Sequence, residues 1–175
     1  MNGNEYADLS ISKRSLNACF SSRSAEWTTP THVVQLILHV LRTVDLDPCS
    51  NSSVNPNIPA ERFYTKAENG LNKRWEGRVF MNPPYGREIS KWVHKLHEEY
   101  QDHRVTEALA LLPARTDTRW FRILRMYPIC FIKGRLKFGN ATNSAPFPSV
   151  VAYLGTKQRT FQKVFSELGD VYKLM

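Results

Sequence analysis

The stretch that most constrains the fold is the apolar run Ala108-Leu109-Ala110-Leu111-Leu112, which Pro113 ends. An unbroken apolar run of this kind is typical of a β-strand buried on both faces, as in the parallel sheets of α/β proteins. Amphipathic helix patterns flank it over residues 88–100 and 117–124. The run therefore predicts a central strand with a helix before it and a helix after it.

Further strand patterns occur at residues 44–47, 62–65, 79–81, 129–132 and 150–154. A helix is predicted with Thr29 as its N-cap, Pro30 as its first residue and an apolar face that continues to Leu41. A closing helix is predicted over residues 161–168, with Gly169 as its C-terminal stop. Because strands alternate with helices, we expect an α/β fold, a three-layer sandwich around a mainly parallel sheet.

Size and charge limit the organisation of the chain. It has 175 residues, of which 42% are hydrophobic, enough for one domain that buries roughly two-thirds of its unfolded surface. We expect an N-terminal arm at residues 1–25 and a single domain over 26–175. The net charge of +8 favours a polyanionic partner, nucleic acid first. A soluble protein that is basic for another reason is the alternative.

Several classes of protein are not indicated. Cys19, Cys49 and Cys130 are widely spaced and form no Cys-x-x-Cys pair, so we expect neither a disulfide framework nor a zinc site. This cysteine usage fits a reducing cytosol. His94 and His97 lie among charged residues on a predicted helix, which indicates a solvated face rather than a metal site. We expect no signal peptide and no membrane span, because the apolar stretches are far shorter than ~20 residues.

The tetrapeptide Asn82-Pro83-Pro84-Tyr85 ends the apolar run Val79-Phe80-Met81. Proline cannot donate to a strand ladder, so these residues lie at the carboxyl edge of the predicted sheet, where ligands bind. The Asn82 side-chain oxygen and the Pro83 carbonyl can accept the two N–H bonds of a planar amine, which localises the nitrogen lone pair for attack. Tyr85 can stack on the attached ring. The alternative is a strand followed by a Pro-Pro loop.

Two other segments carry candidate site residues. Asp47 ends an earlier strand and is followed by Pro48 and a polar turn. A carboxylate there can bind an ammonium group or ribose hydroxyls, and the alternative is an Asp-Pro turn. The segment 26–30 places an exposed tryptophan and free backbone groups at a helix N-terminus, where a ligand can bind. The alternative there is a capped helix with a hydrophobic staple.

These and other motifs follow one another over roughly residues 26–155. They are Trp27-Thr28-Thr29-Pro30, Asp47-Pro48-Cys49-Ser50, Asn69-Gly70-Leu71 with Trp75, Asn82-Pro83-Pro84-Tyr85, Leu112-Pro113-Ala114 with Thr116-Asp117 and Trp120-Phe121, and Gly134-Arg135 with Phe138. The ordered set resembles the small phage-type DNA N-6 adenine methyltransferases, the Dam phage family. Asn-Pro-Pro-Tyr alone is less specific than the set, since several amino-methyltransferases use it.

The resemblance implies a Rossmann-like methyltransferase fold that uses S-adenosylmethionine and needs no metal. It matches Asn82, Pro83, Pro84 and Tyr85 to the catalytic motif. It implies that the following residues contact the cofactor: Trp27, Thr28, Thr29, Pro30, Asp47, Pro48, Cys49, Ser50, Glu68, Asn69 and Asn82. The sequence departs from the wider methyltransferase pattern after the first strand, where residues 49–53 replace the usual glycine-rich loop.

No long insertion is present that could form a separate target-recognition domain, so recognition of the DNA sequence falls on loops. The best candidate is the basic segment 134–148 together with Lys133 before it. Its side chains can reach phosphates and base edges, and the alternative is a solvated hairpin loop. The predicted DNA-binding residues are Lys133, Arg135, Lys137, Asn140 and Asn143.

The predicted function is transfer of a methyl group from S-adenosylmethionine to the exocyclic amine of adenine in double-stranded DNA. The base must leave the stack to reach such a site. An amino-methyltransferase acting on RNA or on a protein glutamine is an alternative, because the tetrapeptide can hold any planar amine. A non-catalytic nucleic-acid-binding module is another. A phage-type enzyme of this kind is expected in the cytoplasm of a bacterial host.

Overall fold

The computed structural model describes residues 27–52, 56–139 and 143–173. The predicted arm at residues 1–25 lies outside these ranges. The described helices are α2 (Thr31–Leu41), α3 (Ile89–Gln101), α4 (Arg119–Leu124) and α5 (Gln158–Phe165), with a short 3-10 helix η1 (Gly70–Asn72). The described strands are β1 (Val44–Asp47), β2 (Ala60–Phe63), β3 (Gly77–Met81), β4 (Val105–Pro113), β5 (Ile129–Ile132), β6 (Ser149–Leu154) and β7 (Gly169–Tyr172).

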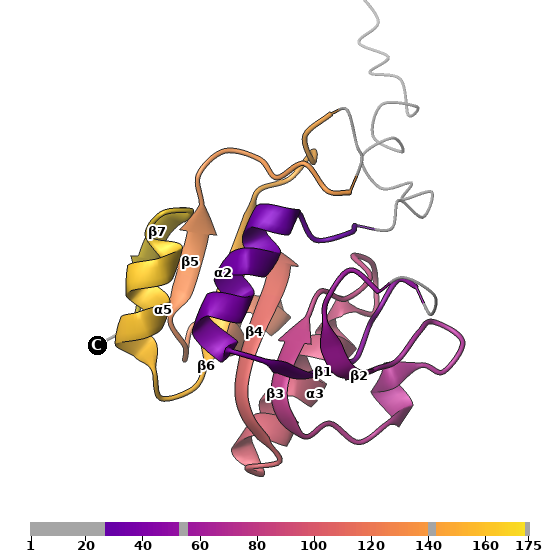
Figure 1. Ribbon diagram of the computed structural model, residues 1–175. Helices are drawn as coiled ribbons and strands as arrows, with labels where there is room; N and C mark the ends of the chain where they lie inside the picture. The colour runs from indigo at the N-terminus through magenta and orange to yellow at the C-terminus, as the bar shows by residue number, and fades with distance from the viewer. Residues whose placement is uncertain (1–26, 53–55, 140–142, 174–175) are drawn as a thin grey trace, which may run out of the picture.

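The seven described strands form one sheet in the order β2-β1-β3-β4-β6-β5-β7. Strands β2, β1, β3 and β4 pair in parallel, whereas β6 runs antiparallel to β4 and β5, and β7 antiparallel to β5. Strands β1 to β5 therefore all point the same way, and β3, β4 and β5 can be followed upward in Figure 1. We call the edge at which these five strands end the carboxyl edge, and the opposite one the amino edge.

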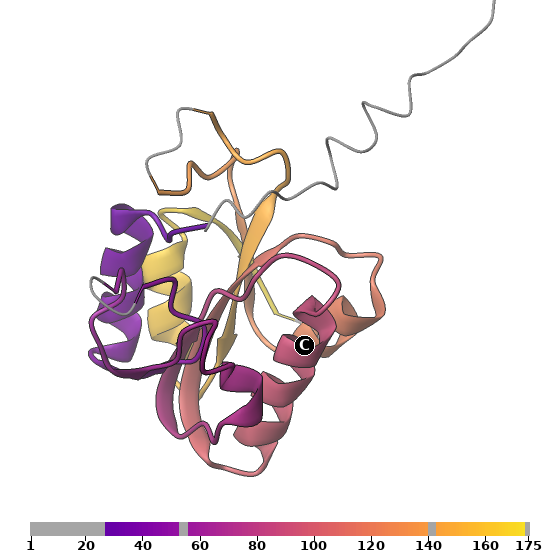
Figure 2. The ribbon, with the colours of Figure 1, turned by 90° about the vertical axis from the view of Figure 1, so that its right-hand side faces the viewer.

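Helices cover both faces of the sheet (Figure 2). Helices α2 and α5 contact each other on one face, and α3 and α4 contact each other on the other. Between these layers β4 is flanked by β3 and β6, and residues 108–112 have no exposed surface. The predicted central strand and its surrounding helices are confirmed. No described helix has the length and apolarity to cross a bilayer.

The end of the chain differs from the prediction. Helix α5 ends at Phe165, and Gly169 begins β7 instead of stopping a helix that reaches Leu168. The reason for the glycine is a close approach of two backbones, since a Cβ at residue 169 would lie 2.0 Å from the Phe131 carbonyl oxygen. Strand β7 is short and mostly exposed, so it has little of the apolar pattern that marks a strand in sequence.

Acidic side chains near the amino edge have cationic partners. Asp45 receives a bidentate contact from Arg78, with Nη2 to Oδ1 at 2.7 Å and Nε to Oδ2 at 3.0 Å. These hydrogen bonds from Arg78 hold the pKa of Asp45 below its ordinary value. The buried Glu107 accepts from the Tyr153 hydroxyl at 2.6 Å and from Lys157 Nζ at 2.8 Å. These carboxylates are satisfied by the fold itself.

Candidate active site

Asp47 and Asn82 meet at the carboxyl edge, as their positions in the sequence predict. Asp47 is the last residue of β1, and Asn82 directly follows β3. The two strands are neighbours, with Leu46 paired to Val79. The Cys49 thiol interacts with the Asp47 side chain and with the backbone N–H of Asn82, so it links the two positions.

The Asn82 side chain is held by its nitrogen and has a free oxygen. Nδ2 donates to the Trp27 carbonyl oxygen at 2.6 Å and to Thr29 Oγ1 at 3.0 Å. Oδ1 is buried and has no hydrogen-bond partner among the described residues. A buried acceptor of this kind is rare, because leaving it unpaired costs about 1–3 kcal/mol. The site therefore holds an acceptor that can receive a hydrogen bond from an N–H donor outside the chain.

Tyr85 lies in a cluster of four aromatic rings, Trp27, Tyr85, Phe138 and Phe147, which we call the aromatic cluster. The Trp27 and Tyr85 rings are nearly parallel, with centroids 6.2 Å apart and 21° between their planes. Phe138 and Phe147 meet Tyr85 edge-on at 6.1 and 5.4 Å. The Tyr85 hydroxyl donates inward to the Leu111 carbonyl at 3.3 Å, and burial raises the pKa of this hydroxyl well above its ordinary value. Tyr85 thus offers a ring rather than a titrating group.

Asp47 is buried without a cationic partner among the described residues. Its side chain is 5% exposed, and its Oδ1 accepts from the Cys49 backbone N–H at 3.1 Å. Burial raises the pKa of Asp47 to about 7, because the hydrogen bonds from Cys49 only partly offset the loss of solvation. Pro48 and Ser50 are also buried, and Ser50 Oγ donates to the Ser52 carbonyl at 3.0 Å. A carboxylate in this state favours a positively charged or hydroxyl-rich ligand.

The segment 27–30 connects the loops of this edge. Asn51 Nδ2 donates to Thr28 Oγ1 at 2.6 Å, and Asn57 Nδ2 donates to the Thr29 carbonyl at 2.8 Å. The Gly139 N–H donates to the Thr28 carbonyl at 2.8 Å. Sequence analysis missed Asn51 and Asn57, whose signal was only the polar composition of their loop.

The predicted capping role of Thr29 is wrong. Pro30 occupies the N-cap position of α2, and its carbonyl accepts from the N–H groups of Val33 and Val34. No side chain caps this end of the helix. The Thr29 hydroxyl is instead engaged with the Asn82 side chain.

Glu68 and Asn69 lie on the loop after β2, beside the Asp47 loop. The closeness is set by Gly70, where a Cβ would lie 2.0 Å from the Pro48 carbonyl oxygen. Glu68 accepts from the Thr65 N–H at 2.9 Å, and this hydrogen bond lowers the pKa of Glu68. Asn69 has a positive φ of 50° and accepts from the Leu71 N–H. Both side chains therefore shape their own turn and remain exposed at the edge.

Four of the predicted DNA-binding residues, Lys133, Arg135, Lys137 and Asn143, follow β5 on the orange segment that extends above the sheet in Figure 1. Arg135, Lys137 and Asn143 are exposed, and Lys133 forms an exposed ion pair with Asp170 at 3.3 Å. Asn140 lies outside the described residues. The described parts of 134–148 contain no helix or strand, as expected for a loop. Phe138 and Phe147 fasten this loop to the aromatic cluster.

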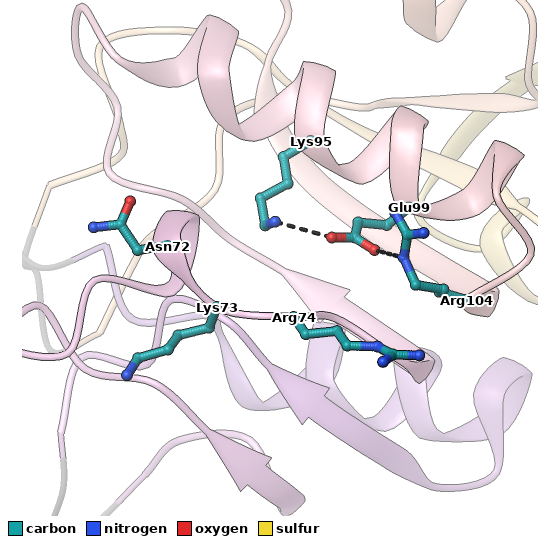
Figure 3. Close-up of a pocket in the computed structure, with 6 residues that line it drawn as sticks. All are labelled: Asn72, Lys73, Arg74, Lys95, Glu99 and Arg104. Carbon is teal, nitrogen blue, oxygen red and sulfur yellow. Dashed lines mark hydrogen bonds and ion pairs between the residues drawn. The ribbon is translucent and has the colours of Figure 1, made fainter.

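A separate pocket of about 450 Å³ lies beside α3 (Figure 3). The lining residues are Asn72, Lys73, Arg74, Lys95, Glu99 and Arg104. Residues 72–74 precede β3 and Arg104 precedes β4, so the pocket faces away from the carboxyl edge. Glu99 pairs with Lys95 at 2.9 Å and with Arg104, which neutralises part of the basic lining. Among the described residues no group of three or more His, Cys, Asp or Glu side chains could hold a metal ion.

The comparison with known proteins agrees with this geometry. Residues 19–154 match the family model described as DNA N-6-adenine-methyltransferase (Dam). No curated protein matched the sequence. The match includes Asp47, the Asn82-Pro83-Pro84-Tyr85 tetrapeptide and the segment 27–30, and membership implies the use of S-adenosylmethionine and a DNA substrate. The chain therefore belongs to the DNA N-6-adenine-methyltransferase (Dam) family, and it methylates the exocyclic amine of adenine in DNA.

Proposed function

We propose that methyl transfer takes place at the carboxyl edge, with Asn82 Oδ1 and the Pro83 carbonyl as the two acceptors of the adenine amine. The observation that carries the proposal is the buried Asn82 Oδ1, which has no partner among the described residues. A flipped adenine brings an N–H donor of the required type to this oxygen. The two acceptors draw the nitrogen towards tetrahedral geometry and localise its lone pair for attack.

When bound, S-adenosylmethionine supplies an electrophilic methyl group attached to a sulfonium sulfur. The residues of the chain align the amine with that methyl group, which is catalysis by positioning. The nitrogen forms the new N–C bond while the C–S bond breaks, and the amine then loses its proton to water. No acidic residue is needed to remove the proton before attack.

Asp47 is the proposed anchor for the cofactor, through its ammonium group or its ribose hydroxyls. Support comes from its burial, with no cation beside it in the described part of the chain, and from its place next to Asn82 across β1 and β3. The exposed Glu68 and Asn69 on the neighbouring loop are proposed to contact the adenosine part. The remaining lining of the cofactor site is proposed to come from the segment 27–30 and from the residues after Asp47. These are Trp27, Thr28, Pro30, Pro48, Cys49 and Ser50.

The fold is proposed to be a Rossmann-like methyltransferase sandwich within a single domain. In its support, five strands share one direction, and the antiparallel β6 lies between β4 and β5. Parallel strands β1 and β2 are joined by residues 48–59, and a polar loop here stands where a glycine-rich turn would be expected.

Recognition of double-stranded DNA is proposed to use Lys133, Arg135, Lys137, Asn140 and Asn143, which makes the enzyme site-specific without a separate recognition domain. The flipped base stacks on the aromatic cluster, whose Trp27 also supplies a carbonyl to Asn82. Flipping costs a few kcal/mol, and stacking contributes about 1–3 kcal/mol per base.

The test is incubation with labelled S-adenosylmethionine and unmethylated duplex DNA, followed by digestion to nucleosides and chromatography. We expect label only in N6-methyl-deoxyadenosine, and its rate of appearance should fall about a hundredfold or more when Asn82→Ala replaces the wild type. Single-stranded RNA and a glutamine-containing peptide serve as alternative substrates. Label in cytosine, RNA or peptide, with none in adenine, would show that the proposed substrate is wrong.

A further inference from the structure

The orientation of the Asn82 amide is fixed by chemistry, because a carbonyl oxygen cannot donate a hydrogen bond. The Trp27 carbonyl lies 2.6 Å from one end of the amide, so that end must be the nitrogen. The second N–H of the same nitrogen points to Thr29 Oγ1 at 3.0 Å. Both N–H groups are thereby used, and Oδ1 is the buried acceptor that has no partner among the described residues.

We propose that Thr29 is a positioning residue, whose hydroxyl holds the Asn82 amide in place so that Oδ1 meets the adenine amine. This role rests on the proposed function of Asn82. It differs from the cofactor contact expected for Thr29 from its motif, because the hydroxyl is engaged with a catalytic side chain. Thr29 is 4% exposed, so no bulk water competes for this hydrogen bond.

Thr29 can act in this way because its backbone is held from other loops. Its carbonyl accepts from Asn57 Nδ2 at 2.8 Å, and the preceding carbonyl of Thr28 accepts from the Gly139 N–H at 2.8 Å. On the other side, the Pro30 carbonyl accepts hydrogen bonds from the first turn of helix α2. The hydroxyl oxygen is therefore held in place. It restrains the position of the amide, while the Trp27 carbonyl, which can only accept, decides which end of the amide is the nitrogen.

Loss of the hydroxyl has a specific consequence for the reaction. With one of two anchors removed, the amide can turn about its χ2 bond, so Oδ1 spends less time at the position where it accepts from the adenine amine. The Trp27 carbonyl still favours the productive orientation, so the effect is smaller than removal of Asn82. We expect about a tenfold fall in kcat, the size of one hydrogen bond.

The experiment compares Thr29→Val, which keeps the shape, with Thr29→Ser, which keeps the hydroxyl. We measure single-turnover methylation of duplex DNA, the Kd for S-adenosylmethionine by calorimetry and the thermal midpoint. Thr29→Val should lower the rate about tenfold with little change in cofactor Kd, and Thr29→Ser should retain most of the wild-type rate. Thr29→Ala provides a second hydroxyl deletion should valine perturb the packing.

A double-mutant cycle with Asn82→Ala separates positioning from a general structural effect. If Thr29 acts through Asn82, Thr29→Val should have little further effect in the Asn82→Ala background, measured over long incubations. The inference is overturned if Thr29→Val weakens cofactor binding instead of turnover, if it leaves turnover unchanged, or if its effect is the same in both backgrounds. Full activity of Asn82→Ala would instead overturn the proposed function itself.

Discussion

Asp45 and Asp47 lie two residues apart on β1, yet their surroundings shift their pKa values in opposite directions. Asp45, near the amino edge, is paired with Arg78 and has a lowered pKa. Asp47, at the carboxyl edge, has no such partner among the described residues, and its pKa is raised to about 7. The same contrast extends to Glu107, which is satisfied by Tyr153 and Lys157.

The difference supports the proposal that one edge stabilises the fold and the other binds ligands. Polar groups at the amino edge find their partners within the chain. At the carboxyl edge, the described residues leave the buried Asp47 without a cation and the buried Asn82 Oδ1 without a hydrogen bond. Such unpaired groups lower stability, and proteins retain them where binding or chemistry requires them. Substitutions at the two edges should therefore separate stability from activity.

The largest expected effect is that of Asn82→Ala on turnover. The change removes a preorganised acceptor for the reacting amine, so we expect a loss of kcat of about a hundredfold or more. Binding of S-adenosylmethionine should be largely retained. Single-turnover methylation and calorimetry measure the two quantities. If the variant keeps the wild-type kcat, methyl transfer does not take place at the carboxyl edge.

Asp47→Asn should weaken binding of S-adenosylmethionine by a factor of about 10 to 100, because a charge-assisted contact of about 1.5–3 kcal/mol is lost. Calorimetry at pH 8, where the wild-type carboxylate is mostly ionised, gives the affinities. Asp45→Asn is the matched control on the same strand and should leave cofactor affinity unchanged. Equal losses in the two variants would show that the edges do not differ in function.

The two aspartates should also make the free energy of unfolding depend on pH in opposite ways. The folded pKa of Asp47, about 7, exceeds an unfolded value of about 3.9, so the folded state binds more protons between these values. The contribution of Asp47 to the free energy of unfolding therefore falls as pH rises through this window, by about 3 kcal/mol between pH 5 and pH 8. Asp47→Asn should remove this component.

The contribution of Asp45 to the free energy of unfolding changes with pH in the opposite direction. Its lowered pKa means that its stabilising contribution is present above the unfolded value of about 3.9 and is lost as pH falls through the folded one. Asp45→Asn should reduce stability by about 1 kcal/mol at neutral pH, as expected for a partly exposed ion pair. Urea denaturation of wild type and both variants at pH 5 and pH 8 measures these changes; parallel pH profiles for the two variants would contradict the assignment.

Binding of DNA should fall steeply with salt, since phosphate contacts release counterions. Substituting Arg135 and Lys137 together by alanine should lower the slope of log affinity against log salt by about 1 to 2 units if both lie on the backbone. Alanine at Lys73 and Arg74, in the pocket beside α3, is the control. An unchanged slope in the first variant would assign residues 134–148 to a solvated loop.

The smallest effect is expected for Tyr85→Phe. The hydroxyl makes only a 3.3 Å hydrogen bond to Leu111, so its loss should reduce stability by about 1 kcal/mol or less and leave turnover close to wild type. Tyr85→Ala, which removes the ring, should lose about 1–3 kcal/mol of stacking. A large loss of turnover in the phenylalanine variant would assign a chemical role to the hydroxyl.

Local sequence signals predicted much of the fold. The bounds of β1 and β5 agree with the prediction, and β4 was identified from its unbroken apolar run. The sequence does not predict strand β7 because only Gly169 of its four residues is buried, and that glycine is explained by contact with a distant strand. A glycine that ends a helix and one that permits a close approach of backbones have the same appearance in sequence.

The position of Asn82 at a strand end could likewise be predicted, because two prolines mark it. Its hydrogen bonds to Trp27 and Thr29 could not be, since more than 50 residues separate the partners and no periodicity connects them. Sequence also gave no sign that Asn51 and Asn57 would bind the segment 27–30, or that Phe147 would join the aromatic cluster. These contacts depend on topology, which brings the loops to one edge.

The aromatic cluster has a consequence for redesign of the enzyme. Phe138 and Phe147 belong to the loop proposed to recognise DNA, yet both pack on Trp27 and Tyr85 beside the catalytic motif. If this loop recognises DNA as proposed, recognition and methyl transfer are not separable modules in this protein. A loop transplanted from a relative to change sequence preference would have to bring both phenylalanines with it, or the graft would bind its new site and leave the base unmethylated.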